Sequence, residues 1–326
     1  MTQRNFIAKR ENDWKEMELI LTGNVRKRFF SRSLPYNKAA GFPQAYRQLL
    51  GDLNTARSNG FDPALIERLN RLTLEGNQIL YSIKPFSLRA FLEFFRRTFP
   101  RSVRAQWKSF YVFFLIFFGL AIFFALVSIR FPGFVYEIMS PWEAANLEDM
   151  YNPESFYYLR PRKISTDADM FGFYIYNNIS IAFITFAGGI LAGIGSLFIL
   201  AANAVFIGVA AGHIINCGYY GTFFSFVVGH SAFELSAIIL SALAGFHLGY
   251  SLLVTRGQNR GAALREAGKT ALPLISGSAF MLVIAAIIEA FWSSRHEIPQ
   301  NIRFAAGGTM IVLITLYFVF AGRTRT

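Results

Sequence analysis

Between Phe171 and Ser251 the chain carries one formal charge, that of Glu234. A soluble core does not require so long an apolar run, whereas each helical crossing of a bilayer requires about 20 predominantly apolar residues. A carboxylate within such a run is costly to bury and is a functional-site hypothesis by default. The run therefore predicts a polytopic membrane protein and draws attention to the polar side chains inside it.

The charges outside this run are unevenly distributed. Residues 1–108 hold 20 Lys and Arg against 9 Asp and Glu, which accounts for nearly all of the net charge of +12. Such an excess before the first apolar segment is typical of the cytoplasmic side of a membrane protein. No nucleic-acid-binding motif accompanies it, so nucleic acid is not an expected partner. The single cysteine, Cys217, excludes an internal disulfide and a cluster of several thiolates.

Residues 1–108 are predicted to form a cytosolic helical region that ends in a membrane-surface helix. Apolar residues at helical spacing predict helices over 4–22 and 44–57. A third helix begins at Asp62-Pro63, where an N-cap residue precedes a proline in the first turn. The N-terminus lacks the apolar segment of a signal peptide, so we expect a cytosolic helix there.

The end of this region, from Phe86 to Phe110, alternates phenylalanines with basic residues. This pattern suits an amphipathic helix in the headgroup layer, with membrane lipid as its partner. The alternative is an ordinary positive flank without a specific ligand. The residues predicted to face lipid headgroups are Arg96, Arg97, Arg101 and Arg104.

Residues 109–326 are predicted to form a transmembrane domain of about six helices, which makes the fold class an all-α membrane protein. The fourth apolar stretch is too long for one plain crossing, so Gly229 is expected to divide it into a short outer segment and a span that starts near His230. The expected spans cover residues 111–129, 173–187, 195–213, 224–254, 271–292 and 304–320.

The charges of the loops predict the orientation of these spans. The loop 131–170 has seven acidic and three basic residues, whereas the segment 255–269 has four basic residues and one acidic residue. Because basic loops stay in the cytoplasm, the first loop is expected outside and the second inside. Both termini are then cytoplasmic.

Three pairs of glycines have the G-x-x-x-G spacing, which allows helix backbones to approach closely in a membrane. Packing inside the bundle is one interpretation of these pairs, and the seam of a homodimer is the other. The pairs are Gly189 and Gly193, Gly208 and Gly212, and Gly245 and Gly249.

The predicted topology brings polar side chains from several spans toward the outer leaflet. His230 and Glu234 are four residues apart and therefore share a helical face, and Glu289 lies near the outer end of the fifth span. Further candidate ligands for a small molecule or ion are Asn178, beside Asn177, and Asn203 and His213.

Several chemistries suit such a group. His230, Glu234 and Glu289 are a plausible ligand set for a divalent metal, and two carboxylates at one depth also suit a proton relay or a cation site. The alternative is a purely structural cluster, in which the buried polar groups form hydrogen bonds with one another and with free backbone groups. The sequence contains no H-E-x-x-H, G-x-S-x-G or Walker motif, so no catalytic residue is assigned.

The segments 177–208, 229–249 and 287–294, which carry these polar residues in order within apolar runs, resemble the stage II sporulation protein M (SpoIIM) family. The opening residues 6–21 also fit. The matching polar residues are His230, Glu234, Glu289, Asn178 and Asn203. Ser231 and Ala204 depart from the family pattern, where glycine is expected.

The resemblance implies a multi-pass protein of a bacterial or archaeal cytoplasmic (inner) membrane. It also implies partners, namely peptidoglycan-remodelling proteins or a MoxR-type AAA ATPase system. The favoured function is a non-enzymatic membrane scaffold of an envelope-associated complex. The alternatives are a proton- or cation-coupled transporter or channel that uses Glu234 and Glu289, and an intramembrane metal-dependent hydrolase.

Overall fold

The structure, a computed structural model, describes residues 2–27, 41–80, 87–159, 164–255 and 257–323. Within these ranges every regular element is helical, which confirms the predicted fold class. The chain forms two compact units, Met1–Ser87 and Leu88–Thr326. Each unit is described by itself.

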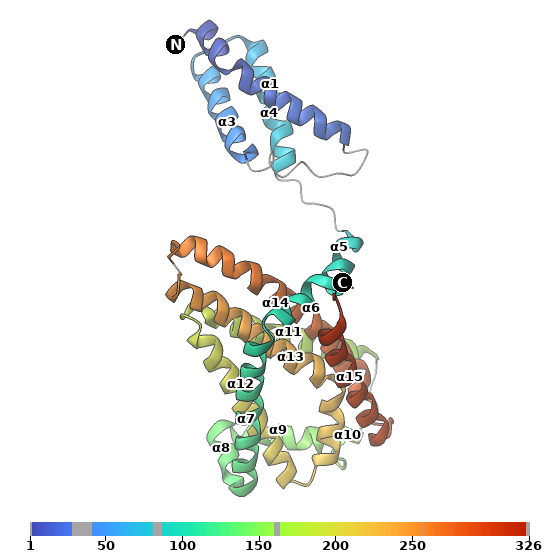
Figure 1. The fold of residues 1–326 in the computed structure, drawn as a ribbon. Coiled ribbons are helices and arrows are strands. Elements are labelled where there is room, and N and C mark those ends of the chain that lie inside the picture. Colours follow the sequence, from blue (N-terminus) through green and yellow to red (C-terminus); the bar gives the residue numbers. More distant parts are fainter. Residues whose placement is uncertain (1, 28–40, 81–86, 160–163, 256, 324–326) are drawn as a thin grey trace. The chain divides into compact units, whose positions relative to one another are not determined.

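The N-terminal unit contains the three predicted helices, α1 (Gln3–Lys27), α3 (Phe42–Ser58) and α4 (Pro63–Leu80) (Figure 1). Asp62 caps α4, because its carboxylate accepts the backbone N–H of Ala64 at 2.8 Å. Side chains from all three helices form one apolar core. Its largest members include Phe6, Trp14, Leu21, Phe42, Tyr46, Leu49, Leu53, Leu69 and Leu72. The unit therefore has a core of its own.

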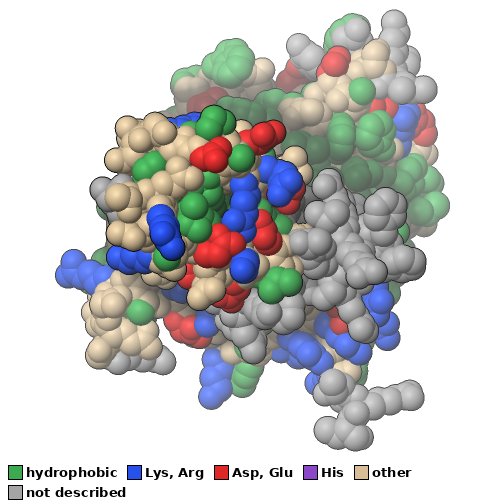
Figure 2. Space-filling view, turned by 90° about the horizontal axis from the view of Figure 1, so that it is seen from above, with side chains coloured by type: hydrophobic (Ala, Val, Ile, Leu, Met, Phe, Trp, Pro, Cys, Tyr) green, Lys and Arg blue, Asp and Glu red, His purple; other side chains and the backbone are tan. Residues whose placement is uncertain are grey.

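Ion pairs cross the surface of this unit. Arg68 of α4 donates to Glu11 and Glu18 of α1, each at 2.9 Å. Figure 2 shows basic and acidic side chains next to one another over the face that it presents. These pairs are partly exposed, so each contributes modestly to stability.

A buried carboxylate connects α1 to α3. Asp52 accepts hydrogen bonds from Arg10 Nε at 2.8 Å and from Trp14 Nε1 at 2.9 Å. Arg10 also pairs with Asp13 at the surface. Asp52 thus holds two donors that would otherwise be desolvated without an acceptor.

Asp52→Ala should therefore lower the free energy of unfolding of this unit by about 3 kcal/mol, the cost of removing one partner of a mostly buried ion pair. The measurement is chemical denaturation of the expressed unit 1–87, followed by fluorescence of Trp14, its one tryptophan. The matched control is Asp13→Ala, which removes the exposed partner of the same arginine and should cost less than about 1 kcal/mol. Equal effects of the two substitutions would contradict the assignment.

The segment that follows packs with the membrane unit. It consists of α5 (Leu88–Glu93), a π-helical turn η1 (Phe94–Thr98) and α6 (Phe99–Ala105). Phe99 is 1% exposed, and its ring occupies the space that a side chain at position 277 would need. The two compact units meet near residue 87, and this aromatic segment is part of the bundle core.

The second unit contains six helices long and apolar enough to cross a membrane. The described chain is thus a multi-pass membrane protein. The helices are α7 (Trp107–Arg130), α11 (Ile164–Ala187), α12 (Ile194–Asn216), α13 (Tyr220–Leu253), α14 (Arg260–Ile288) with its π-helical extension η4 (Glu289–Ser293), and α15 (Gln300–Phe320).

The predicted division of the fourth span at Gly229 is wrong. Helix α13 runs without interruption for 34 residues, or about 50 Å at ~1.5 Å per residue. Gly229 serves close packing instead, because a Cβ there would lie 2.6 Å from Ser293 Oγ. The helix is longer than the bilayer's hydrocarbon thickness of about 30 Å.

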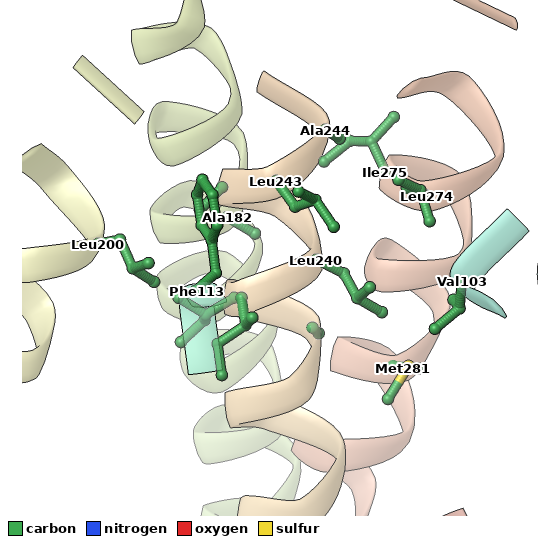
Figure 3. Packing of buried hydrophobic residues seen from close by; sticks show 14 of the residues in the cluster. Val103, Phe113, Ala182, Leu200, Leu240, Leu243, Ala244, Leu274, Ile275 and Met281 are labelled. Carbon is green, nitrogen blue, oxygen red and sulfur yellow. The ribbon is translucent and has the colours of Figure 1, made fainter. Parts of the chain in front are cut away.

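Helix α13 lies at the centre of the unit. Figure 3 shows Leu240, Leu243 and Ala244 of α13 between side chains of α14 on one flank and of α7, α11 and α12 on the other. These α13 residues are fully buried. Over residues 237–245 the helix is buried all round, so this part of α13 forms the centre of the core.

The three glycine pairs pack helix against helix inside the chain. A Cβ at Gly189 would overlap the Gly245 carbonyl, and one at Gly249 would overlap the backbone of Gly189 and Gly193. Cβ atoms at Gly208 and Gly212 would overlap carbonyls of α7. All three pairs thus bring backbones within the bundle into contact, as the first of the two interpretations expects.

Short helices gather at one end of the unit, opposite to α5, α6 and the C-terminus (Figure 1). We call this end the loop side and the opposite end the terminal side. The short elements are η2 (Pro132–Phe134), α8 (Val135–Ile138), α9 (Pro141–Tyr151) and α10 (Phe156–Leu159). A capping box between Ser140 and Glu143 starts α9. These helices bring further side chains to the ends of the spans.

Candidate functional site

Two glutamates and a histidine meet in the bundle near the loop side. His230 and Glu234 lie one turn apart on α13, with His230 Nε2 3.5 Å from Glu234 Oε2. Glu289 of η4 completes the group, and one ligand atom from each residue lies within 4.8 Å of the others. The His230 and Glu289 residues are 4% and 8% exposed. We call these three residues the His–Glu–Glu cluster.

The π-helical turn η4 positions Glu289. A single π turn shifts the register of a helix and is frequent at functional sites. The same turn carries Ser293, whose hydroxyl lies 3.2 Å from His230 Nδ1. Since Gly229 leaves room for Ser293, α13 and η4 approach closely at this level. The histidine ring is thereby fixed with Nε2 toward the carboxylates.

Amide and phenol groups surround the cluster. Asn178 of α11 lies next to Glu289 and accepts a hydrogen bond from Asn177 at 3.1 Å. Tyr151 of α9 lies near the cluster. Its pKa is raised well above the usual value, mainly by burial and further by Tyr174 and the charges of the two glutamates. Its phenol therefore keeps its proton and can donate to the site.

The side chains of Glu289 and Asn178 lie next to each other in the site. Within the described part of the chain, no other group hydrogen-bonds to Glu289 Oε2 or to Asn178 Nδ2, although both atoms are buried. An unpartnered carboxylate oxygen in a water-poor layer is costly. A proton or a cation held between the carboxylates would remove that cost.

Two predicted site residues lie elsewhere. Asn203 donates its side-chain N–H to the Ile199 carbonyl of its own helix at 2.8 Å. His213 pairs with Glu148 of α9, its Nε2 lying 2.8 Å from Glu148 Oε1. The structure thus brings together His230, Glu234, Glu289 and Asn178, and leaves Asn203 and His213 outside this group.

Sequence reasoning missed Tyr151, Glu148 and Ser293. Tyr151 and Glu148 belong to the acidic and aromatic loop, whose residues could be assigned to one side of the membrane but not to a particular helix end. Ser293 sits in a π-helical turn, which leaves no clear periodic signal in a sequence. For Glu148, the available signal was indirect: its partner His213 stands four residues before Cys217, so these two residues share one face of a helix.

The arginines predicted at the lipid surface divide into two groups. Arg101 Nε donates to the Gly322 carbonyl at 2.7 Å, and a terminal N–H of Arg104 donates to the Phe318 carbonyl at 2.8 Å. These two bind the C-terminal end of α15. Arg96 and Arg97 are exposed, with Arg97 paired to Glu93 at 3.0 Å.

Comparison with known sequences decides the family. The sequence profile of stage II sporulation protein M (SpoIIM) matches residues 111–294, more than half of the chain. The chain belongs to the SpoIIM family. In this SpoIIM-family protein the matched part runs from α7 to the end of η4 and includes the whole His–Glu–Glu cluster.

A second profile, a domain of unknown function (DUF8413), matches residues 4–82, which correspond to the N-terminal unit. The uncharacterized protein MJ0793 of Methanocaldococcus jannaschii is 31% identical over 117 residues. That match covers 35% of this SpoIIM-family chain and 66% of MJ0793. No solved structure matches the chain.

Proposed function

We propose that this SpoIIM-family protein is a membrane scaffold of an envelope-associated complex, and that its His–Glu–Glu cluster binds one divalent cation within the bundle. The observation that carries the cation site is the convergence of three ligand atoms from α13 and η4 within 4.8 Å in a buried place. One imidazole and two carboxylates suit Mn²⁺, Fe²⁺ or Zn²⁺.

The architecture supports the scaffold role. The N-terminal unit has a core of its own and a surface of mixed charges, which suits the binding of a soluble partner. The loop charges favour an orientation with this unit and the C-terminus in the cytoplasm and the helices α8–α10 outside. By family resemblance, the partners are peptidoglycan-remodelling proteins outside or a MoxR-type AAA ATPase inside.

Within such a scaffold the cation has a mechanical role. His230 and Glu234 belong to the central helix α13, whereas Glu289 belongs to the end of α14. A cation shared between them fixes the two helices at the loop side, where α9 contributes Tyr151. Because bound metal adds its binding free energy to folding, the outer surface of the scaffold would depend on this ion.

The test uses Mn²⁺ as the probe, since a site rich in carboxylates suits it and a thiolate does not. Chelator-treated protein in detergent should take up one Mn²⁺ at this site, detected by electron paramagnetic resonance. The double substitution Glu234→Gln/Glu289→Gln should weaken uptake at least tenfold. The matched control, Glu266→Gln, removes an exposed carboxylate paired with Lys269 and should leave uptake unchanged.

The same double substitution also distinguishes a scaffold from a transporter. If the double substitution abolishes Mn²⁺ uptake while partners still co-purify from membranes, the cation and scaffold roles are separate properties of one protein. Loss of cation or proton flux in liposomes on the same substitution would instead favour a transporter. Wild-type protein that binds no Mn²⁺ would overturn the proposed cation site.

A transporter is the second candidate, and one observation favours it. Glu234 and Glu289 lie in one buried group inside the bundle, and ionisable residues at such a depth are typical of proton and ion pathways.

A further inference from the structure

We propose a second metal site, made of Glu148, His213 and Cys217, which takes a borderline transition-metal ion with Zn²⁺ as the best match. One ligand atom from each of these residues lies within 4.8 Å of the others. We call this group the Glu–His–Cys cluster. It does not depend on the His–Glu–Glu cluster or on the function proposed for it.

The fold brings these ligands together from two elements. His213 and Cys217 are four residues apart at the C-terminal end of α12, so they lie on one face of that helix. Glu148 comes from α9, across the loop side. The capping box of Ser140 starts α9, and Tyr151 at its end packs edge-on against Phe223 of α13. Glu148 is therefore held toward α12 by contacts on both sides.

The distances are close to those of a tetrahedral site. His213 Nε2 lies 2.8 Å from Glu148 Oε1 and 3.8 Å from Cys217 Sγ. Bonds of about 2.0–2.1 Å to nitrogen and about 2.3 Å to sulfur place two tetrahedral ligand atoms about 3.5 Å apart. For these two pairs of ligand atoms, movements of less than about 1 Å would accommodate the ion.

The donor set selects the class of metal. One thiolate, one imidazole and one carboxylate suit Zn²⁺ and similar transition metals, whereas Mg²⁺ and Ca²⁺ prefer oxygen ligands alone. Three protein ligands leave a fourth position for water or a substrate. The side chain of His213 is 8% exposed and that of Glu148 is 40% exposed, so the buried histidine is reached from solvent past the carboxylate.

A second observation distinguishes this group from an ordinary surface ion pair. His213 Nδ1 is buried without a hydrogen-bond partner in the described part of the chain. Nε2 faces both Glu148 and Cys217, so a metal ion bound there would take the place of the Nε2 proton and leave the ring proton on Nδ1. The ring is oriented with one nitrogen toward two further metal-binding atoms.

The only cysteine of the chain makes the test specific. Chelator-treated full-length protein in detergent is titrated with Co²⁺, which gives a thiolate-to-cobalt charge-transfer band in the near ultraviolet when sulfur binds it. Any such band must come from Cys217. We expect a band that saturates at one Co²⁺ per chain and is displaced by Zn²⁺.

Variants define the other ligands. Cys217→Ser should abolish the band, and His213→Ala and Glu148→Gln should each weaken Co²⁺ affinity at least tenfold. The matched control is Glu137→Gln, an exposed acid of the same loop, which should leave affinity unchanged. Glu234→Gln/Glu289→Gln should also leave the band intact, so failure of the first site and failure of this one are distinguishable.

Two results would overturn the proposal. The first is wild-type protein that elutes as a single species yet shows no charge-transfer band with saturating Co²⁺. The second is a band whose affinity does not change in His213→Ala and Glu148→Gln. As a check that does not depend on a folded variant, Zn²⁺ should slow the alkylation of Cys217 by a maleimide in the wild type at least tenfold, and unchanged alkylation would equally count against the site.

Discussion

Gly249→Val should prevent assembly of the membrane unit. A Cβ at position 249 would overlap the carbonyl oxygen of Gly189 and the backbone nitrogen of Gly193. Both obstacles are backbone atoms of the neighbouring segment, so no side-chain rotation relieves the clash. Overpacking of this kind in a rigid core typically costs about 1–3 kcal/mol, and a clash between two backbones exceeds that range.

The measurement is the yield of monodisperse protein in detergent and its apparent Tm. The matched control is Gly119→Val on α7, because a Cβ at Gly119 would meet nothing within 4 Å. We expect at least a tenfold loss of folded protein for Gly249→Val and nearly wild-type yield for the control. Similar yields of the two variants would show that α13 does not depend on this contact.

Arg295→Leu should lower the free energy of unfolding by about 3 kcal/mol, because it removes the partner of a buried carboxylate from an ion pair whose arginine is 34% exposed. Asp167, at the start of α11, is 0% exposed, and its Oδ2 accepts a hydrogen bond from Arg295 at 2.7 Å. Without the arginine, the carboxylate loses this charged donor in a place that water does not reach. The pair also holds the start of α11 close to the end of η4, next to the His–Glu–Glu cluster.

Thermal unfolding in detergent measures this effect, and a double substitution tests its cause. Asp167→Asn/Arg295→Leu removes the buried charge as well and should recover most of the lost stability. Lys269→Leu is the matched control, since it breaks an ion pair with Glu266 whose side chains are both about two-thirds exposed. It should change stability by less than about 1 kcal/mol. A double variant no more stable than Arg295→Leu would show that the carboxylate is not the cause.

Much of the membrane architecture could be predicted because the bilayer restricts each segment. Apolar length alone located the six spans, since no unpaired backbone survives in lipid. The spacing of four residues placed His230 and Glu234 on one face of a helix, and their side chains lie 3.5 Å apart. These features depend on one helix at a time.

Features that depend on two helices were harder to predict. Gly229 lies inside the continuous helix α13 and packs closely against Ser293, whereas a glycine considered in isolation resembles a helix break. The aromatic and basic pattern before α7 is typical of a surface helix, yet Phe99 fills the space beside Gly277 in the core. In both cases the deciding partner lies far away in sequence, where periodicity carries no information.

The hold of the basic segment on the last helix has a mechanical consequence. Arg101 and Arg104 bind carbonyls at the end of α15, and the Tyr317 hydroxyl donates to the Phe95 carbonyl at 2.6 Å. These hydrogen bonds hold the segment before the first span against the end of the last span. A force applied to the residues before Leu88 would therefore be shared by the first and the last span of the bundle.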